Sequence, residues 1–141
     1  MSLIFALLRE NHIIFAADSR HVRGCEEARY LNDDCWKTQL ILGNSAMIGF
    51  AGDDSVEQVI GKLQRHGDLE RESLVEVAKK IGMTARERVN AYPQNAMPPM
   101  EFLLAGFVSE GGEKTATAFR LAPDNVFLPA FDYPQVWLSG S

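Results

Sequence analysis

The chain has 141 residues, of which 46% are hydrophobic and 23% are charged, and this size and composition suit one domain with a sizeable core. Its net charge of −5 argues against a nucleic-acid-binding surface, because such surfaces use clustered Lys and Arg to neutralise phosphates. No apolar run approaches the roughly 20 residues that span a bilayer, and the N-terminus lacks a basic region followed by a cleavage site. The composition predicts a soluble, cytoplasmic protein without a nucleic-acid or membrane partner.

Short apolar runs in the first third of the chain are typical of strands. Residues 3–8 and 13–17 flank a polar Arg-Glu-Asn-His segment and predict a hairpin of two buried strands. A polar and irregular stretch follows from residue 20 to 34. Residues 38–42 and 46–50 then predict a second hairpin that turns at a Gly-Asn pair. Four strands are therefore expected before any helix.

The hydrophobic pattern changes to a helical period after Gly52. Residues 54–67 carry apolar side chains at i, i+3, i+4 and i+7, between an Asp-x-x-Glu capping box and a closing glycine. A second and longer helix is predicted to open at the Ser-x-x-Glu box of residues 73–76 and to keep one apolar face until Pro93. Two amphipathic helices follow the predicted strands.

The last third of the chain again predicts strands. Residues 102–108 and 115–121 flank a Gly-Gly turn, and residues 126–131 and 135–138 are further short apolar runs. Strands, two helices and strands in that order favour an α+β domain with helices packed on a mainly antiparallel sheet. Because the chain ends directly after an apolar run, we expect it to be a fragment of a larger fold.

Three short motifs stand out from this framework. Ala-Asp-Ser-Arg (residues 17–20) ends a predicted strand, Lys37 begins another, and Gly-Phe-Ala-Gly-Asp (residues 49–53) precedes the first helix. Each motif has a plain structural explanation as a surface ion pair, a solvated cation or a pair of turn glycines. His12, His21, His66 and the two cysteines show no metal-ligand spacing, so no metal site is expected.

Taken together and in order, the motifs resemble the proteasome β-subunit family of N-terminal-nucleophile (Ntn) hydrolases and the related bacterial ring proteases. The resemblance extends over the whole chain. It implies one partial Ntn domain over residues 1–141, of the αββα four-layer sandwich type, truncated on its C-terminal side so that the last helices and strands are missing. It also implies a hydrolase without a cofactor.

The resemblance assigns roles to individual residues. Ser2 falls on the family's N-terminal threonine, Asp18 on its acidic active-site residue and Lys37 on its lysine. Gly49 falls on the oxyanion-hole glycine, and Ser141 on a serine that supports the amine of the nucleophile.

The resemblance also suggests residues that contact substrate. The side chains that shape the pocket for the residue before the scissile bond map to His21, Met47 and Ala51. Because Met47 is apolar and Ala51 is small, the implied pocket is apolar.

The chemistry of the assigned residues is coherent. An N-terminal serine carries both a hydroxyl nucleophile and an α-amine whose ordinary pKa of about 7.7–8.0 suits a general base. The ammonium of Lys37 would lower the pKa values around it, and Asp18 would hold that lysine in place. The backbone N–H at Gly49 would stabilise the oxyanion.

Two features of this chain depart from the family pattern besides its length. Serine replaces threonine at the nucleophile position, and serine serves as nucleophile in other Ntn enzymes. Met1 precedes Ser2 and, if retained, would convert the α-amine into an amide. Removal of Met1 is therefore a condition for activity.

Three functions stay open at this stage. The first is a proteasome-type peptidase that acts on peptide or protein substrates, assembled as a homo-oligomeric ring in its full-length form and possibly served by an ATPase partner. The second is a non-catalytic subunit of the same fold, and the third is an Ntn amidase for a small amide. A fragment without its outer helical layer would expose apolar sheet surface and self-associate.

Overall fold

The computed structural model shows a mixed α/β fold with antiparallel sheets and two helices. It describes residues 3–18, 21–23, 30–32, 37–52, 54–70, 73–91, 100–123 and 136–140. The antiparallel α+β class predicted from the order of elements is confirmed.

A four-stranded antiparallel sheet lies at the centre of the structure. Its strands are β5 (Thr38–Ile41), β6 (Ala46–Gly52), β7 (Met100–Glu110) and β8 (Glu113–Leu121), in the order β5-β6-β7-β8. The hairpin predicted for residues 38–50 is present, and so are the strands predicted on either side of the Gly-Gly turn, although β7 and β8 extend further toward that turn than predicted. The added strand residues next to the turn are mostly polar, so the apolar runs that predicted these strands are shorter than the strands themselves.

A second antiparallel sheet contains β1 (Leu3–Leu8), β2 (Ile13–Ala17) and β9 (Val136–Gly140), in the order β2-β1-β9. The hairpin predicted at the start of the chain is confirmed at both of its strands. β9 matches the run predicted at 135–138, whereas the strand predicted at 126–131 lies outside the described residues. The first and last described strands are therefore neighbours in one sheet.

The segment predicted to be irregular contains two short strands, so that prediction was wrong. β3 (His21–Arg23) and β4 (Tyr30–Asn32) form a two-stranded antiparallel ribbon. Strands of three residues are too short to show an alternating pattern in the sequence, so only the backbone pairing of the structure reveals them.

Helices α1 (Asp54–His66) and α2 (Leu74–Asn90) confirm both predicted helices. The Ser73 hydroxyl accepts a hydrogen bond from the Glu76 N–H at 3.4 Å, which is the predicted N-cap. Gly67 follows α1 with a φ of 72°, a conformation in which glycine avoids the steric cost of a side chain. Neither helix is long and apolar enough to cross a membrane.

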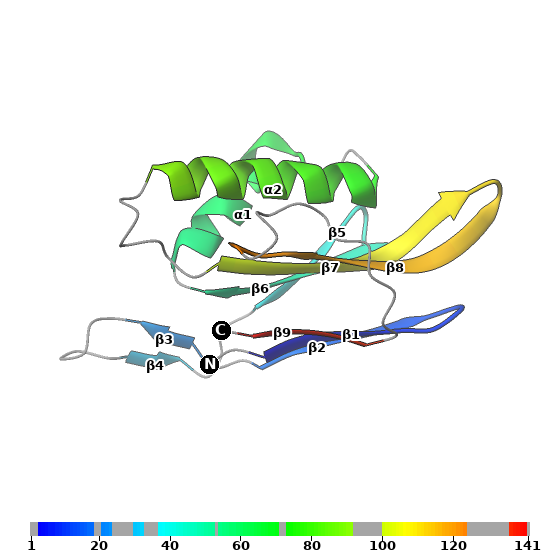
Figure 1. The fold of residues 1–141 in the computed structure, drawn as a ribbon, viewed down its shortest axis with the longest axis horizontal. Coiled ribbons are helices and arrows are strands. Elements are labelled where there is room, and N and C mark those ends of the chain that lie inside the picture. The colour runs from blue at the N-terminus through cyan, green and yellow to red at the C-terminus, as the bar shows by residue number, and fades with distance from the viewer. Residues whose placement is uncertain are drawn as a thin grey trace.

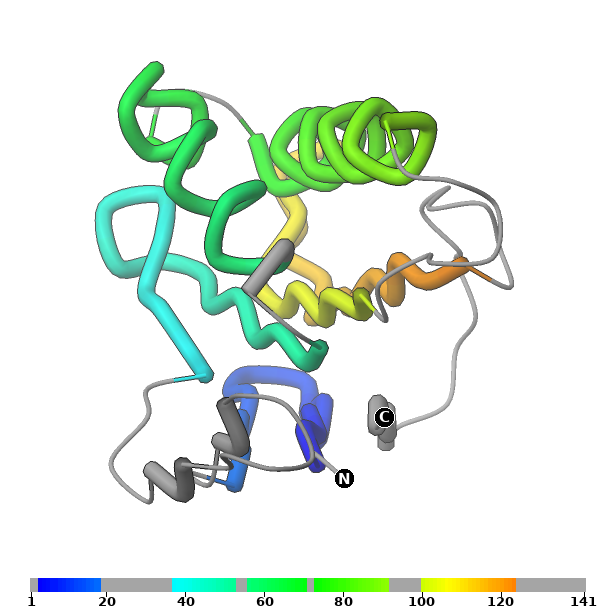
Figure 2. The backbone as a smooth tube through the Cα atoms, turned by 90° about the vertical axis from the view of Figure 1, so that its left-hand side faces the viewer, coloured from blue at the N-terminus to red at the C-terminus, as the bar shows by residue number. Residues whose placement is uncertain are grey.

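The two helices cover one face of the four-stranded sheet, and the three-stranded sheet lies against its other face (Figure 1, Figure 2). Phe102, Leu104 and Phe119 point to the helices and are fully buried, whereas Leu103 and Ala105 point to the second sheet. Residues of β7 therefore alternate between two cores. Three layers result from the described residues: helices, sheet and sheet.

Candidate active site

Two strand ends from different sheets meet through one ion pair. Asp18 directly follows β2, and Lys37 directly precedes β5. The Lys37 Nζ lies 2.9 Å from Asp18 Oδ1, and the Lys37 side chain is 3% exposed whereas that of Asp18 is 33% exposed. A buried ammonium requires a partner, so the contact orients Lys37 and links the two sheets at one edge.

The same carboxylate also binds the start of β1. Asp18 Oδ1 accepts a hydrogen bond from the Leu3 N–H at 3.1 Å, and the Asp18 N–H donates to the Leu3 carbonyl at 2.9 Å. One oxygen of Asp18 therefore holds both the ammonium of Lys37 and the amide that follows Ser2 in sequence. Ser2 itself lies outside the described residues.

The pKa of Asp18 is lowered. Partial burial disfavours the charged carboxylate and raises the pKa, but the hydrogen bonds from Lys37 and Leu3 and the positive charge of Lys37 lower it by more. The carboxylate therefore stays ionised at neutral pH and keeps the lysine ammonium paired.

Gly49 lies at a close contact between the two sheets. A Cβ atom built on Gly49 would lie 2.7 Å from Cγ2 of Ile4 and 2.8 Å from Cε1 of Phe15, closer than carbon atoms approach without strain. Gly49 also pairs with Thr38, the residue after Lys37. Close packing therefore requires a glycine here, whatever its backbone N–H does in catalysis.

The residues predicted to contact substrate fall in different environments. Met47 and Ala51 lie two residues before and after Gly49 on β6, and Met47 is half-buried whereas Ala51 is 2% exposed. The predicted His21 belongs to β3, and its side chain lies outside the described part. Of the two β6 residues, Met47 offers the larger surface to a ligand.

Sequence reasoning missed Leu40. It lies directly opposite Met47 in the β5–β6 register and is 48% exposed, so the two side chains form an open apolar surface beside Gly49. The signal was available, because the hairpin register follows from the Gly-Asn turn and facing residues share one side of a sheet.

A second missed feature is an ion pair between neighbouring strands of the four-stranded sheet. Glu101 on β7 lies beside Ala51, and its Oε1 is 3.2 Å from the guanidinium of Arg120 on β8. The side chains are 15% and 25% exposed. In the sequence, Glu101 and Arg120 each stand among apolar residues of their strands, although only the register shows that the two charges meet.

The last predicted catalytic residue, Ser141, also lies outside the described residues. Its sequence neighbour Gly140 pairs with Leu3, the neighbour of Ser2. In the described part of the chain, no three His, Cys, Asp or Glu side chains are grouped as metal ligands. The described site contains a fixed cation, its carboxylate partner and the backbone at the start of β1.

This arrangement of two facing antiparallel sheets and one helical layer is a proteasome-like fold. The chain is similar in structure to Anbu (ancestral beta-subunit) from Yersinia bercovieri, with a TM-score of 0.72 and 22% identity. It is also similar to an Anbu (Gly-1) mutant from Hyphomicrobium sp. strain MC1, with a TM-score of 0.68 and 20% identity.

The likeness covers this chain almost completely but only part of its structural neighbours. Both cover 99% of this chain but 60% of the Anbu chain, so this chain spans less than two thirds of the length of its structural neighbours. No family model matches the chain, and no curated protein matches it. At 20–22% identity, the likeness shows the fold alone.

The resemblance to the proteasome β-subunit family therefore has to be corrected. The similar solved structures are of Anbu, and the relationship to the proteasome is one of fold. The motif residues explain the error, because Asp18, Lys37 and Gly49 lie at strand ends and at a close contact between the sheets, where packing alone can account for them. Such positions cannot separate families built on the same fold.

Proposed function

We propose that this chain carries the nucleophile-bearing part of an amide hydrolase with a proteasome-like Ntn fold. One observation carries the proposal: Asp18 Oδ1 holds both the buried ammonium of Lys37, at 2.9 Å, and the N–H of Leu3, at 3.1 Å. Leu3 follows Ser2, so the ammonium of Lys37 is fixed close to the proposed nucleophile. A nearby cation favours the neutral form of the Ser2 α-amine and stabilises the negative charge that develops during attack.

Acylation begins with a proton transfer. After Met1 is removed, the Ser2 α-amine accepts the hydroxyl proton as Oγ attacks the carbonyl carbon of an amide. The carbonyl electrons move to oxygen, and the proposed N–H at Gly49 stabilises the oxyanion. The C–N bond then breaks, the leaving amine takes the proton from the α-ammonium, and an ester to Ser2 remains.

Deacylation uses the same groups. Water attacks the ester and gives its proton to the α-amine, and the Ser2 Oγ regains that proton as the ester bond breaks. Lys37 keeps its positive charge throughout, and Asp18 holds it in place. Ser141 supports the α-amine in this proposal, and the open apolar surface of Met47 and Leu40 favours peptides with an apolar residue before the scissile bond.

The proposal extends to the rest of the fold. The outer face of the three-stranded sheet carries apolar side chains, including Leu3 at 50% and Ile14 at 47% exposure. We assign a fourth, helical layer to this face, corresponding to the part of the Anbu chains that this chain does not cover. In this proposal, residues 1–141 are a single, partial domain with three of the four layers of the sandwich. The whole protein assembles as a homo-oligomer that cleaves peptide bonds.

Mass spectrometry after treatment with a β-lactone tests the nucleophile. We expect intact protein without Met1 and one acyl adduct on the N-terminal peptide, lost in Ser2→Ala. Lys37→Met should slow adduct formation by about 100-fold or more. The matched control is Lys80→Met, which removes a lysine paired with Asp68 at 3.0 Å outside the site and should leave the rate unchanged.

A second candidate is a non-catalytic subunit, and the packing of Gly49 favours it. Contact with Ile4 and Phe15 explains the glycine without an oxyanion, and an ion pair between sheets explains Lys37 without catalysis. If the folded protein retains Met1 and forms no adduct, the chain is a non-catalytic subunit. An adduct without turnover of peptides, together with hydrolysis of small amides, would indicate an amidase.

A further inference from the structure

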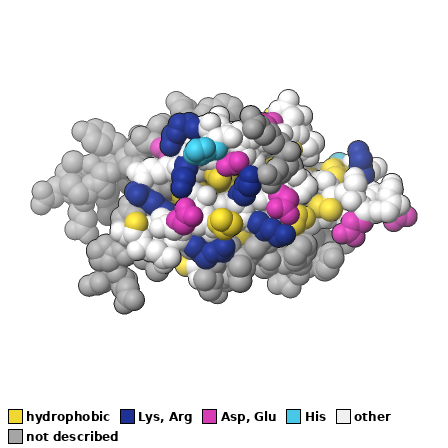
Figure 3. Space-filling view, turned by 90° about the horizontal axis from the view of Figure 1, so that it is seen from above, with side chains coloured by type: hydrophobic (Ala, Val, Ile, Leu, Met, Phe, Trp, Pro, Cys, Tyr) yellow, Lys and Arg dark blue, Asp and Glu magenta, His cyan; other side chains and the backbone are white. Residues whose placement is uncertain are grey.

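The two helices form a basic face on an acidic chain. The chain has a net charge of −5, but lysine and arginine outnumber acidic residues on α1 and α2. The basic residues are Lys62, Arg65, Lys79, Lys80, Arg86 and Arg88, and the acidic ones are Asp54, Glu57, Glu76 and Glu87. Figure 3, which looks onto this face, shows the basic side chains spread across it. Basic residues therefore outnumber acidic ones on the two helices, and Figure 3 shows acidic side chains interspersed among the basic ones.

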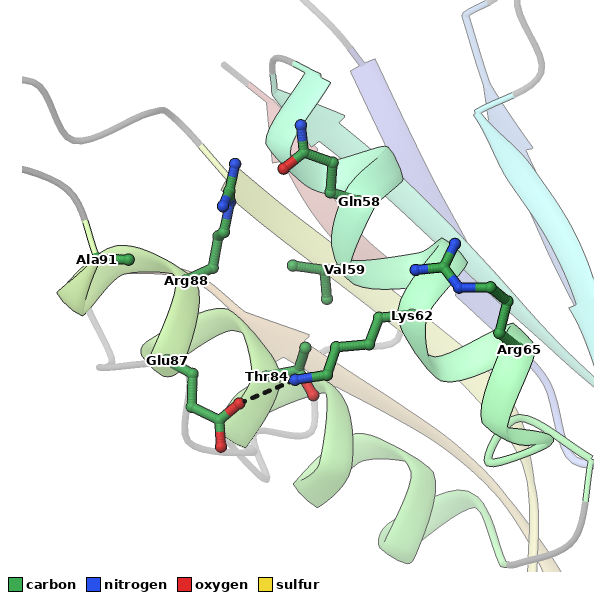
Figure 4. Close-up of a pocket in the computed structure, with 8 residues that line it drawn as sticks. All are labelled: Gln58, Val59, Lys62, Arg65, Thr84, Glu87, Arg88 and Ala91. Carbon is green, nitrogen blue, oxygen red and sulfur yellow. Dashed lines mark hydrogen bonds and ion pairs between the residues drawn. The ribbon is translucent and has the colours of Figure 1, made fainter.

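A groove of about 270 Å³ opens between the helices on this face. Lys62 and Arg65 line it from α1, and Arg88 lines it from α2, around the apolar floor of Val59 (Figure 4). The Arg65 guanidinium folds back along its helix, 3.4 Å from the position that a Cβ on Gly61 would take. Three cationic side chains from two helices therefore share one concave surface.

The acidic residue of the groove is held only weakly. Lys62 Nζ reaches across the groove to Oε2 of Glu87 at 3.3 Å, with side chains that are 51% and 62% exposed. Exposed pairs of this kind contribute little to stability. An incoming carboxylate can take the place of Glu87 at Lys62, so the groove is able to bind an anionic group.

The chain has an acidic counterpart at the tip of the β7–β8 hairpin. This hairpin projects beyond the helices (Figure 1) and turns at Gly111 and Gly112, with φ values of 59° and 85°. The cross-strand pair next to the turn is Glu110 opposite Glu113. Like charges directly opposite each other destabilise a hairpin, and within the described ranges neither glutamate has an ion-pair partner. A cationic surface would relieve this repulsion.

The tip cannot reach the groove of its own chain. Leu74, at the start of α2, lines a pocket together with Glu110, whereas Arg88 and Ala91, at the other end of α2, line the basic groove. With 17 residues in α2 and a rise of roughly 1.5 Å per residue, the two surfaces are separated by most of the length of that helix. Their charges can therefore meet only between two molecules.

We propose that the chain self-associates head to tail, with the acidic hairpin tip of one copy seated in the basic groove of the next. Glu110 and Glu113 enter the groove and bind Lys62 and Arg65, which removes the repulsion at the tip. Such a contact joins different surfaces, so repetition produces a ring where the rotation closes. The inference rests on the proposed assembly as a homo-oligomer, and it is independent of hydrolysis.

Sedimentation of the full chain and of charge-reversed variants tests the contact. Glu110→Lys with Glu113→Lys, and separately Lys62→Glu with Arg65→Glu, should each weaken self-association by about tenfold or more. All four changes together should restore it, and increasing salt should weaken association of the unaltered chain. Matched controls are Glu10→Lys at the exposed β1–β2 turn and Lys79→Glu outside the groove, and both should behave like the unaltered chain.

The outcomes separate this contact from other modes of assembly. Assembly that survives reversal of the tip, or that strengthens with salt as apolar contacts do, overturns the inference but leaves the proposed oligomer standing. If both double variants associate more weakly but the chain with all four changes does not recover, the tip and the groove bind different partners. That result also overturns the inference. A chain that stays monomeric at about 100 μM removes both the inference and the proposed assembly. Glu110→Gln with Glu113→Gln repeats the test if a reversed variant fails to fold.

Discussion

The ammonium of Lys37 lies 2.9 Å from Asp18 Oδ1, across the boundary between the two sheets. The lysine is buried and the aspartate is one third exposed, so the environments of the two charges differ. Removing the aspartate therefore affects a buried charge, whereas removing the lysine leaves a carboxylate that water can still reach.

Asp18→Asn removes the carboxylate charge that lies 2.9 Å from the buried ammonium of Lys37. We expect the free energy of unfolding to fall by about 1–3 kcal/mol, less than for a fully buried pair because Asp18 is partly exposed. Urea denaturation measures the change. Asp68→Asn, which breaks the more exposed pair with Lys80, is the control and should cost about 0–1 kcal/mol. Equal losses in the two variants would contradict a special role for the Asp18–Lys37 pair.

Acid should destabilise the protein through Asp18. Its pKa is lowered in the folded protein, so the folded state binds a proton less readily than the unfolded state does. The resulting stabilisation is complete above a pH of about 4, the ordinary range of an aspartate, and is lost as the pH falls through the folded pKa. Urea denaturation between pH 2 and 6, approximately, should show a shallower acid loss in Asp18→Asn than in the unaltered chain.

Gly49→Ala should overpack the space between the sheets. Its Cβ would lie 2.7 Å from Ile4 Cγ2 and 2.8 Å from Phe15 Cε1, which predicts a loss of about 1–3 kcal/mol. Phe15→Leu in the same chain should recover part of that loss relative to the sum of the two single changes. Gly61→Ala in α1, which meets only the end of Arg65, is the control and should be neutral or stabilising. A tolerated Gly49→Ala that abolishes adduct formation would instead assign the glycine to catalysis.

The outer face of the three-stranded sheet should tolerate polar residues better than the inner face does. Ile14 is 47% exposed, whereas Ile4 is fully buried. We expect Ile14→Ser to cost less than about 1 kcal/mol and to reduce binding of an apolar dye. Ile4→Ala should cost about 2–4 kcal/mol. Thermal melts and dye fluorescence measure both effects, and an Ile14→Ser as damaging as Ile4→Ala would show that this face is already covered.

The sequence predicted the local elements well because their signals are short-range. The apolar spacing of residues 54–67, the Ser73 cap and the Gly-Asn turn each depend on interactions within a few residues of the chain. The ribbon of β3 and β4 was missed because it lacks an apolar pattern. Asp18 and Lys37 were predicted as site residues from a resemblance to the proteasome β-subunit family, and the structural comparisons corrected that family assignment.

By itself, the sequence determined two helices, the Ser73 cap of the second, the hairpins on either side of them and an acidic composition. Only the tertiary structure decided that Asp18 joins Lys37 and the amide of Leu3, that Gly49 has to be a glycine, and that Glu101 meets Arg120. These contacts depend on how two sheets pack and on the register between strands, and residues distant in the chain come together only after loop closure. Local propensity does not determine that geometry, because the same pattern of apolar residues along the strands is compatible with several ways of packing the two sheets.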